Sequence, residues 1–301
     1  MRPTLTGFLD IGNTTTFEEQ ITLATKLGIR QIALRADGGK PLVEVSPERF
    51  GHMSSALKKA RLKVSLVDPM VSSSALDDTK AHEIALKTFS YVVRQTALLK
   101  PTHILLPLPE HADVIKQFEA VKAWIDPFIA QAQGSKILLK PQGKTKANSL
   151  AYVMKKMGSK LAGVVFDPVH IVSLRESTTT AYRLLRKDIV AMMAVDANTH
   201  GTTKLIGYGQ TDILSVFKKL FRDKYAGYLV VENRFDLDQA PDKEETKGFF
   251  KKLFSNEKKR KASLMRELSH KIFPDGDSER DISDEEILSN QVKVITKLFI
   301  D

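Results

Sequence analysis

Short apolar runs rich in Val, Ile and Leu alternate along the chain with longer segments whose apolar residues recur at helical spacing. The runs at 137–139 (Ile-Leu-Leu) and 164–166 (Val-Val-Phe) are continuously apolar, which is typical of parallel strands buried on both faces. The pattern predicts eight strands. Their expected ranges are Leu5–Ile11, Gln31–Arg35, Lys63–Val67, His103–Pro107, Lys136–Lys140, Gly163–Asp167, Val190–Val195 and Gly227–Glu232.

The segments between these strands have the period of amphipathic helices. Ser46 followed by Pro47 marks one helix start, because serine caps free amides and proline suits the first helical position. The expected helices are Phe17–Leu27, Pro47–Ala60, Asp77–Leu99, Glu110–Gln133, Asn148–Met157, Thr178–Arg186, Asp212–Phe221 and Ile287–Ile300.

Eight strand–helix units in strict alternation predict an α/β protein with a parallel sheet, and eight strands is the number that closes a barrel. The first strand–helix turn, Asp10–Thr14, lacks the G-x-G-x-x-G of a dinucleotide-binding sheet. We therefore expect residues 1–301 to form a single (β/α)8 TIM barrel. Residues 235–286 interrupt the alternation between strand eight and the last helix, and partial helical periodicity over Lys247–Lys271 predicts a helical excursion there.

Composition excludes several classes of protein. The chain has no Cys, so disulfides, thiolate metal sites and cysteine nucleophiles are excluded. No apolar run approaches the roughly 18 residues that span a bilayer, and Met1–Leu5 lacks the apolar core of a signal peptide. We expect a cytoplasmic protein with no membrane partner.

The unusual feature of the composition is its charge. There are 46 Lys and Arg against 36 Asp and Glu, a net charge of +10. The basic cluster Lys258–Lys261 does not explain this excess, because residues 244–290 sum to −1 and the rest of the chain to +11. This balance favours a small anionic ligand over a dedicated nucleic-acid arm.

Charged and polar residues gather where the predicted strands end. Active sites of such barrels lie at the carboxyl ends of the strands, and charges near a core are costly unless they are paired or functional. The residues at these positions are Asp10, Arg35, Asp68, Glu110, His111, Lys140, Gln142, Asp167, His170, Asp196, His200, Glu232 and Arg234.

Some of these positions have a structural alternative. Asp10 and Asp68 suit helix or turn caps as well as a site. The loop 35–40 (Arg-Ala-Asp-Gly-Gly-Lys) has the glycines and cations of a phosphate loop, or is an ordinary solvent loop. Gly207 and Gly209 either contact phosphate or shape a tight turn.

Three segments resemble a known family: Lys136-Ile-Leu-Leu-Lys-Pro-Gln142, Val164-Val-Phe-Asp-Pro-Val-His170 and Gly227-Tyr-Leu-Val-Val-Glu232, with Gly207-Tyr-Gly-Gln-Thr-Asp212 between the last two. They are similar to the xylose-isomerase-like barrels of the sugar phosphate isomerase/epimerase family, a superfamily that also holds endonuclease IV. The resemblance implies Mn²⁺, Mg²⁺ or Zn²⁺ held by Glu, Asp, His and Glu at strands five to eight, with the two glutamates transferring a proton.

Carried over by position, the resemblance places metal ligands at Asp167 and Glu232 and a substrate contact at His170. Lys140 stands where the strand-five glutamate belongs, and Met193 stands where the strand-seven histidine belongs. Methionine is a poor ligand for a hard cation, so the metal site departs from the family pattern.

Three interpretations of Lys140 are open. It neutralises Asp167 and Glu232 in place of a metal in a site that only binds ligand, it acts as a catalytic lysine, or other residues retain a metal. Replacing Lys140 by Glu and Met193 by His should then restore metal affinity. The candidate catalytic residues are Lys140 and Glu232, and the candidate substrate contacts are Arg35, Gln142, His170, His200 and Arg234.

Three functions follow. The first is a sugar or sugar-phosphate isomerase/epimerase acting on a small anionic carbohydrate. The second is a catalytically silent barrel that binds a ligand or a partner, with Phe249–Phe254 as a candidate homo-oligomer contact. The third, an endonuclease IV-like enzyme acting on nucleic acid, is least favoured, because its metal cluster needs many His ligands and the chain has 7 His.

Overall fold

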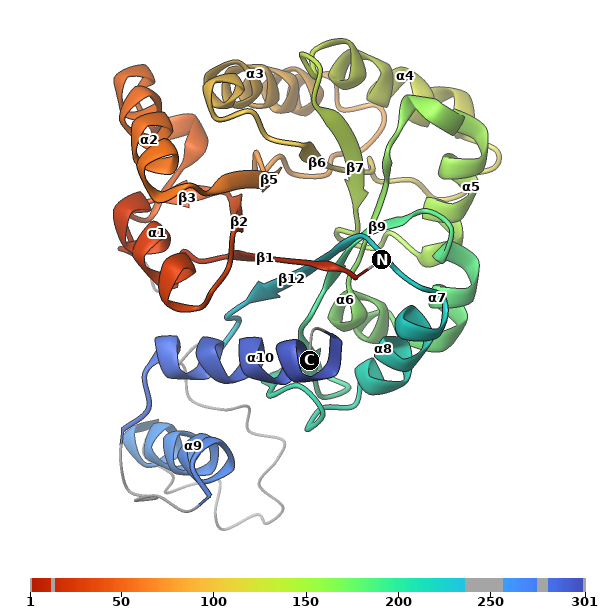
Figure 1. Cartoon of the computed structure of the whole chain (residues 1–301). Coiled ribbons are helices and arrows are strands. Elements are labelled where there is room, and N and C mark those ends of the chain that lie inside the picture. The colour runs from red at the N-terminus through yellow and green to blue at the C-terminus, as the bar shows by residue number, and fades with distance from the viewer. Residues whose placement is uncertain (1, 12–13, 236–256, 275–280, 300–301) are drawn as a thin grey trace.

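The computed structural model describes residues 2–11, 14–235, 257–274 and 281–299, with the backbone alone for 257–263. Eight parallel strands close into a barrel in the order β1-β12-β9-β8-β7-β6-β5-β2 (Figure 1). The strands are β1 (Thr4–Phe8), β2 (Gln31–Leu34), β5 (Lys63–Val67), β6 (His103–Pro107), β7 (Lys136–Lys140), β8 (Gly163–Phe166), β9 (Ile189–Met193) and β12 (Tyr228–Glu232). The predicted (β/α)8 TIM barrel is confirmed.

Helices surround the barrel, as the periodicity predicted. Their bounds are α1 (Phe17–Lys26), α2 (Pro47–Ala60), α3 (Thr79–Thr96), α4 (Phe118–Ala130), α5 (Ala147–Met157), α6 (Pro168–Ser173), α7 (Thr178–Leu185), α8 (Ile213–Arg222), α9 (Glu257–Ile272) and α10 (Asp284–Phe299). Of these, α9 lies outside the ring of helices, beside α10 (Figure 1). Single 3-10 turns lie at Leu42–Glu44, Ala97–Leu99 and Gly158–Lys160, and short hairpins pair β3 (Ala36–Asp37) with β4 (Lys40–Pro41) and β10 (Asp196–Ala197) with β11 (Thr203–Lys204).

Two helices differ from the prediction. The helix expected from Glu110 begins at Phe118, because the preceding residues form a loop closed by side chains: Gln117 accepts the amides of Ala112 and Asp113. The six-residue α6 was not predicted. It starts because the carboxylate of Asp167 caps the amides of Val169 and His170, with Pro168 at the first position.

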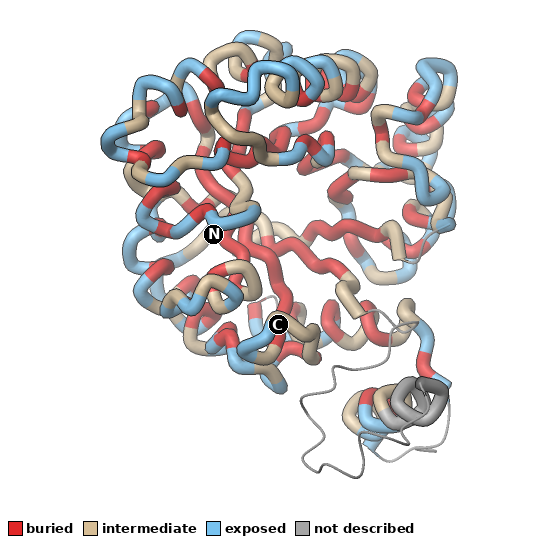
Figure 2. The backbone as a smooth tube through the Cα atoms, turned by 180° about the vertical axis from the view of Figure 1, so that it is seen from behind, coloured by how far each residue is buried: buried red, intermediate tan, exposed pale blue. Residues whose placement is uncertain are grey.

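The core has an inner and an outer part. Inward-facing side chains such as Phe8, Leu66 and Met193 fill the barrel, while a larger apolar layer lies between the strands and the helices. Figure 2 shows buried residues along the strands and exposed residues on the helices. This rigid barrel fixes the positions of the strand ends.

The excursion after strand eight is described in part. Its helix α9 packs Leu268 against Leu205, Ile282 and Ile287, a small apolar cluster beside α10. The candidate contact at 249–254 and residues 275–280 lie outside the described residues. In the described part of the chain, no helix is long and apolar enough to cross a membrane.

Candidate active site

Four carboxylates and three cations meet at the carboxyl end of the barrel, since parallel strands all end on the same side. Glu232 is the last residue of β12, and its side chain is only 7% exposed. The other side chains are between 12% and 28% exposed, so a ligand can reach them from solvent. They are Asp10, Arg35, Asp68, Lys140, Asp167 and Arg234.

Arg35 connects the ends of β1, β2 and β12. Its Nε donates to Asp10 Oδ2 at 2.7 Å, and its Nη1 donates to Glu232 Oε1. Its guanidinium also lies over the ring of Phe8, with 4.7 Å between Cζ and the ring centroid. The structure thus places Arg35 at the carboxyl end of the barrel, and its contact with a substrate stays a prediction.

Arg234 holds the other oxygen of Glu232. Its Nε donates to Glu232 Oε2 at 2.7 Å, and its Nη2 donates to Asp167 Oδ2 at 2.9 Å. The second oxygen of Asp167 caps α6 at 3.0 Å from the Val169 amide. The two carboxylates that the resemblance assigned to a metal are thus bound by guanidinium groups.

These contacts set the charges of the ring. Burial alone would raise the pKa of Glu232, but Arg234 and Arg35 more than offset it and hold the pKa below its usual value. At Asp10 burial outweighs the attraction of Arg35 and the pKa is raised. Burial would lower the pKa of both arginines, but the adjacent carboxylates raise it. Both guanidiniums therefore stay charged.

Lys140 has a different partner from the one expected. Its Nζ donates to both oxygens of Asp68, at 2.9 and 2.8 Å. The expectation that Lys140 neutralises Asp167 and Glu232 is corrected here, because Arg35 and Arg234 occupy those carboxylates. Asp68, for which the sequence also allowed the role of a turn cap, belongs to the ring. Its carboxylate in addition accepts a hydrogen bond from the Met70 amide.

The donor set does not fit a divalent metal. The strand-five and strand-seven positions hold an ammonium, Lys140, and a thioether, Met193, which is buried in the barrel interior. The oxygens of Glu232 each accept a guanidinium hydrogen bond. Among the described residues there is also no group of three or more His, Asp or Glu suited to a metal ion. We therefore assign no step to a metal.

The remaining predicted contacts are dispersed. His170 Nε2 hydrogen-bonds the Thr145 carbonyl at 2.8 Å, which fixes it against the loop after β7. His200 is exposed on the loop after β9. In the loop 35–40, the carboxylate of Asp37 accepts the Phe17 amide and the Arg49 guanidinium, so this loop is anchored to helices α1 and α2.

Asp196 organises the loop after β9. It is 2% exposed, and its carboxylate accepts the amides of Gly207 and Gly209 and the hydroxyl of Thr211, at 2.9, 3.0 and 2.7 Å. A Cβ at Gly209 would lie 2.1 Å from Asp196 Oδ1. In this structure Gly207 and Gly209 therefore shape a tight turn around the Asp196 carboxylate.

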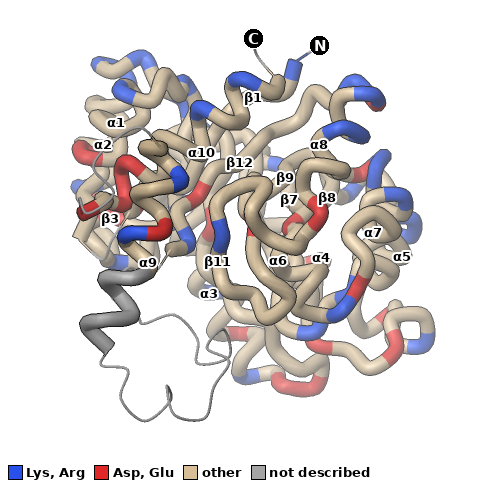
Figure 3. Tube along the Cα trace, turned by 90° about the horizontal axis from the view of Figure 1, so that it is seen from below, with Lys and Arg blue, Asp and Glu red and all other residues tan. Residues whose placement is uncertain are grey.

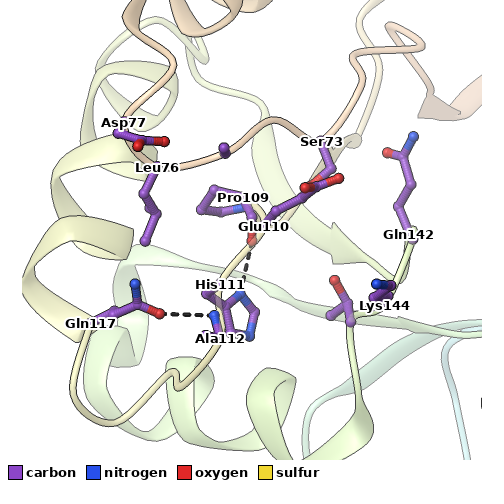
Figure 4. Close-up of a pocket in the computed structure, with 13 residues that line it drawn as sticks. Ser73, Leu76, Asp77, Pro109, Glu110, His111, Ala112, Gln117, Gln142 and Lys144 are labelled. Atoms are coloured by element: carbon purple, nitrogen blue, oxygen red, sulfur yellow. Dashed lines mark hydrogen bonds between the residues drawn. The ribbon is translucent and has the colours of Figure 1, made fainter.

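A pocket of about 730 Å³ lies at this end of the barrel, between the loops that follow β5, β6 and β7 (Figure 4). Gln142 lines it together with Ser73, Glu110, His111 and Lys144, and the contact of Gln142 with a substrate stays a prediction. His111 Nδ1 donates to the Pro109 carbonyl, so its Nε2 accepts from Ser149. Ser73 and Gln117 were missed because a lone Ser or Gln in a loop carries no sequence signal.

Comparisons with known proteins agree with this fold. The family model of the xylose isomerase-like TIM barrel matches residues 21–253, well over half of the chain. The chain belongs to the xylose isomerase-like TIM barrel family. No curated protein matches it in sequence.

Solved structures of similar fold share little sequence with this xylose isomerase-like barrel. D-psicose 3-epimerase with D-tagatose from Clostridium cellulolyticum H10 has a TM-score of 0.65 at 12% identity, over 99% of this chain and 98% of that chain. The 3-keto-D-glucoside 4-epimerase YcjR from E. coli has a TM-score of 0.60 at 17% identity, over 81% and 95%. A xylose isomerase-like barrel from Mycobacterium smegmatis in complex with magnesium has a TM-score of 0.60 at 14% identity, over 78% and 91%.

Proposed function

We propose that the chain binds a small carbohydrate at the carboxyl end of its barrel without a divalent metal. The observation that carries this proposal is the pairing of Glu232 with two guanidiniums, at a place where strand-end carboxylates alternate with cations. Such a ring offers both donors and acceptors to sugar hydroxyls. The pocket that the loops after β5, β6 and β7 form at the same end of the barrel, with Ser73 and Gln142 in its lining, gives the ligand space.

The charge of the ring favours a neutral sugar over the anionic ligand that the composition suggested. Four carboxylates stand against three cations, so the ring sums to −1. Every cation in it already has a carboxylate partner. A phosphate or carboxylate on the ligand would compete with Glu232, Asp167 or Asp68 for these partners.

The reaction that we propose for this site is isomerisation or epimerisation. The carboxylate of Glu232 removes a proton from the carbon next to a carbonyl, and the ammonium of Lys140 hydrogen-bonds the carbonyl oxygen. In isomerisation the protonated Glu232 delivers the proton to the former carbonyl carbon, while the proton of the neighbouring hydroxyl passes to the former carbonyl oxygen. In epimerisation solvent protonates the opposite face of the first carbon, and Glu232 releases its proton to solvent. The sugar epimerases of similar fold support this class of chemistry.

A second candidate is a barrel that binds a sugar without changing it. The observation in its favour is the lowered pKa of Glu232, since a carboxylate held by two arginines is a weak base. The two candidates share the ligand and differ in proton transfer.

Deuterium exchange separates them. The chain is incubated in D2O and EDTA with a panel of aldoses and ketoses, and NMR follows deuterium at the carbon next to the carbonyl. Isomerase or epimerase activity gives exchange that Glu232→Gln and Lys140→Met abolish and that the surface control Lys116→Met retains. Binding without exchange supports the silent barrel, and failure to bind any sugar of the panel contradicts both.

A further inference from the structure

The positive charge of the chain is concentrated at the end of the barrel opposite to the candidate site. Because the eight strands are parallel, the seven connections from a helix into the next strand all meet at the amino-terminal end. We call this end, with the last helical turns, the basal face. It comprises residues 25–31, 57–63, 94–102, 127–136, 155–162, 183–188 and 218–226.

The basal face holds 19 Lys and Arg and two Asp, a net charge of +17, whereas the rest of the chain sums to −7. Eighteen of these 19 cations are exposed and Lys219 is half-buried. Figure 3 shows Lys and Arg along the edge of the barrel on which the N-terminus lies. The net charge of +10 thus conceals a strong asymmetry between the two ends.

Few of the basal cations are neutralised by the protein itself. Within the described part of the chain, Lys26, Lys160 and Arg222 form ion pairs with carboxylates and the other 16 form none. Cations suit helix carboxyl ends because of the helix dipole. That effect falls off within the last turn, however, and Lys63 and Lys136 are the first residues of strands.

Apolar side chains project from among these cations. Phe221, in the last turn of α8, is 71% exposed and lies in sequence between Lys218 and Lys224. Leu184, in the neighbouring α7, is 51% exposed beside Arg183. Surfaces that lie on anionic membranes combine these two features, because cations attract the lipid headgroups while aromatic and aliphatic side chains enter the interface.

We propose that the basal face binds the surface of an anionic lipid bilayer and holds the barrel with its carbohydrate site facing away from the membrane. The cations are 13 Lys and 6 Arg. Lysine acts as a point charge, whereas the guanidinium fork of arginine is the group suited to bidentate phosphate and base contacts in nucleic acids. The exposed leucine also has no base-stacking role, which favours lipid over nucleic acid.

Vesicle sedimentation tests this proposal. The full chain is mixed with vesicles of phosphatidylcholine alone or with one third phosphatidylglycerol, at low and high salt. We expect it to bind the anionic vesicles only, and less at high salt. Each cation near an anionic leaflet contributes about fivefold, so Lys218→Glu with Lys224→Glu should weaken binding at least about 25-fold.

The matched control, Lys80→Glu with Lys116→Glu, reverses the charge of two exposed lysines that lie toward the carboxyl end of the barrel. It should bind as the wild type does. Phe221→Ser should weaken binding without loss of fold. Equal loss in both double variants, no binding to anionic vesicles at low salt, or retention on RNA or DNA without vesicle binding would overturn the proposal.

Discussion

The guanidinium of Arg35 donates a hydrogen bond to the carboxylate of Glu232, although 197 residues separate them along the chain. Arg35 directly follows β2 and Glu232 is the last residue of β12, so the pair spans β1, which lies between these two strands. The resemblance to xylose-isomerase-like barrels placed a metal ligand at Glu232. The positive charge beside this carboxylate is instead supplied by the chain itself.

Removing Arg234 should destabilise the fold. Arg234→Leu leaves Glu232 with one cation and Asp167 with none, and an uncompensated buried carboxylate costs about 2–4 kcal/mol once the partial exposure of Arg234 is allowed for. Urea denaturation measures the loss. The matched control Arg222→Leu removes an exposed pair with Asp223 and should leave stability nearly unchanged. Equal effects would contradict the assigned role.

Acid should weaken the fold through His103. This residue is 8% exposed at the start of β6, and its Nδ1 is buried without a hydrogen-bond partner among the described residues. Burial lowers its pKa from 6.5 to about 4. In the unfolded chain the His103 imidazole is protonated below about pH 6.5, whereas in the folded chain it is protonated only below about pH 4. Stability should therefore fall across this interval, by about 3 kcal/mol in total.

His103→Phe keeps the ring that packs edge-on against Tyr228 and removes the titration. Unfolding free energies between pH 7 and 4 should then fall less steeply than in the wild type, while His52→Gln, at an exposed position, should keep the wild-type slope. A His103→Phe slope equal to that of the wild type would show that this histidine is not the acid-sensitive group.

The loop after β9 should depend on Asp196. Asp196→Ala deprives the amides of Gly207 and Gly209 and the hydroxyl of Thr211 of their acceptor, which should cost at least about 3 kcal/mol. Gly209→Ala should produce a comparable loss, because its Cβ would overlap the Asp196 carboxylate. Chemical denaturation measures the stability of both variants and of the control Glu83→Ala, which removes an exposed carboxylate from helix α3. Wild-type stability in Asp196→Ala would contradict this role.

The barrel could be predicted because continuous apolar strands and capped amphipathic helices are local features. The start of α4 could not, since the side chain of Gln117 closes a loop in a segment that keeps helical periodicity. The partner of Lys140 also depends on the closed barrel. Alternate strands contribute to the same layer of side chains, which brings Lys140 of β7 to Asp68 after β5.

The concentration of charge on the basal face could not be predicted from local sequence either. The sequence counts the lysines, but only the parallel topology brings seven separate connections to one end. Counting charges by segment assigns the excess of positive charge to the residues outside 244–290, but it does not show on which end of the barrel they lie. Because this excess lies away from the mouth, it does not favour an anionic ligand at the site, whose own ring sums to −1.

Titration with Mn²⁺ tests the central claim, a site whose cations come from the chain. After treatment with EDTA and its removal, the wild type should show no binding heat and no change in melting temperature. Lys140→Glu with Met193→His alone should gain little, because Arg35 and Arg234 still hold Glu232 and Asp167, whereas adding Arg234→Leu should create affinity. Saturable binding of one Mn²⁺ per wild-type chain, abolished by Asp167→Asn or Glu232→Gln, would contradict the account.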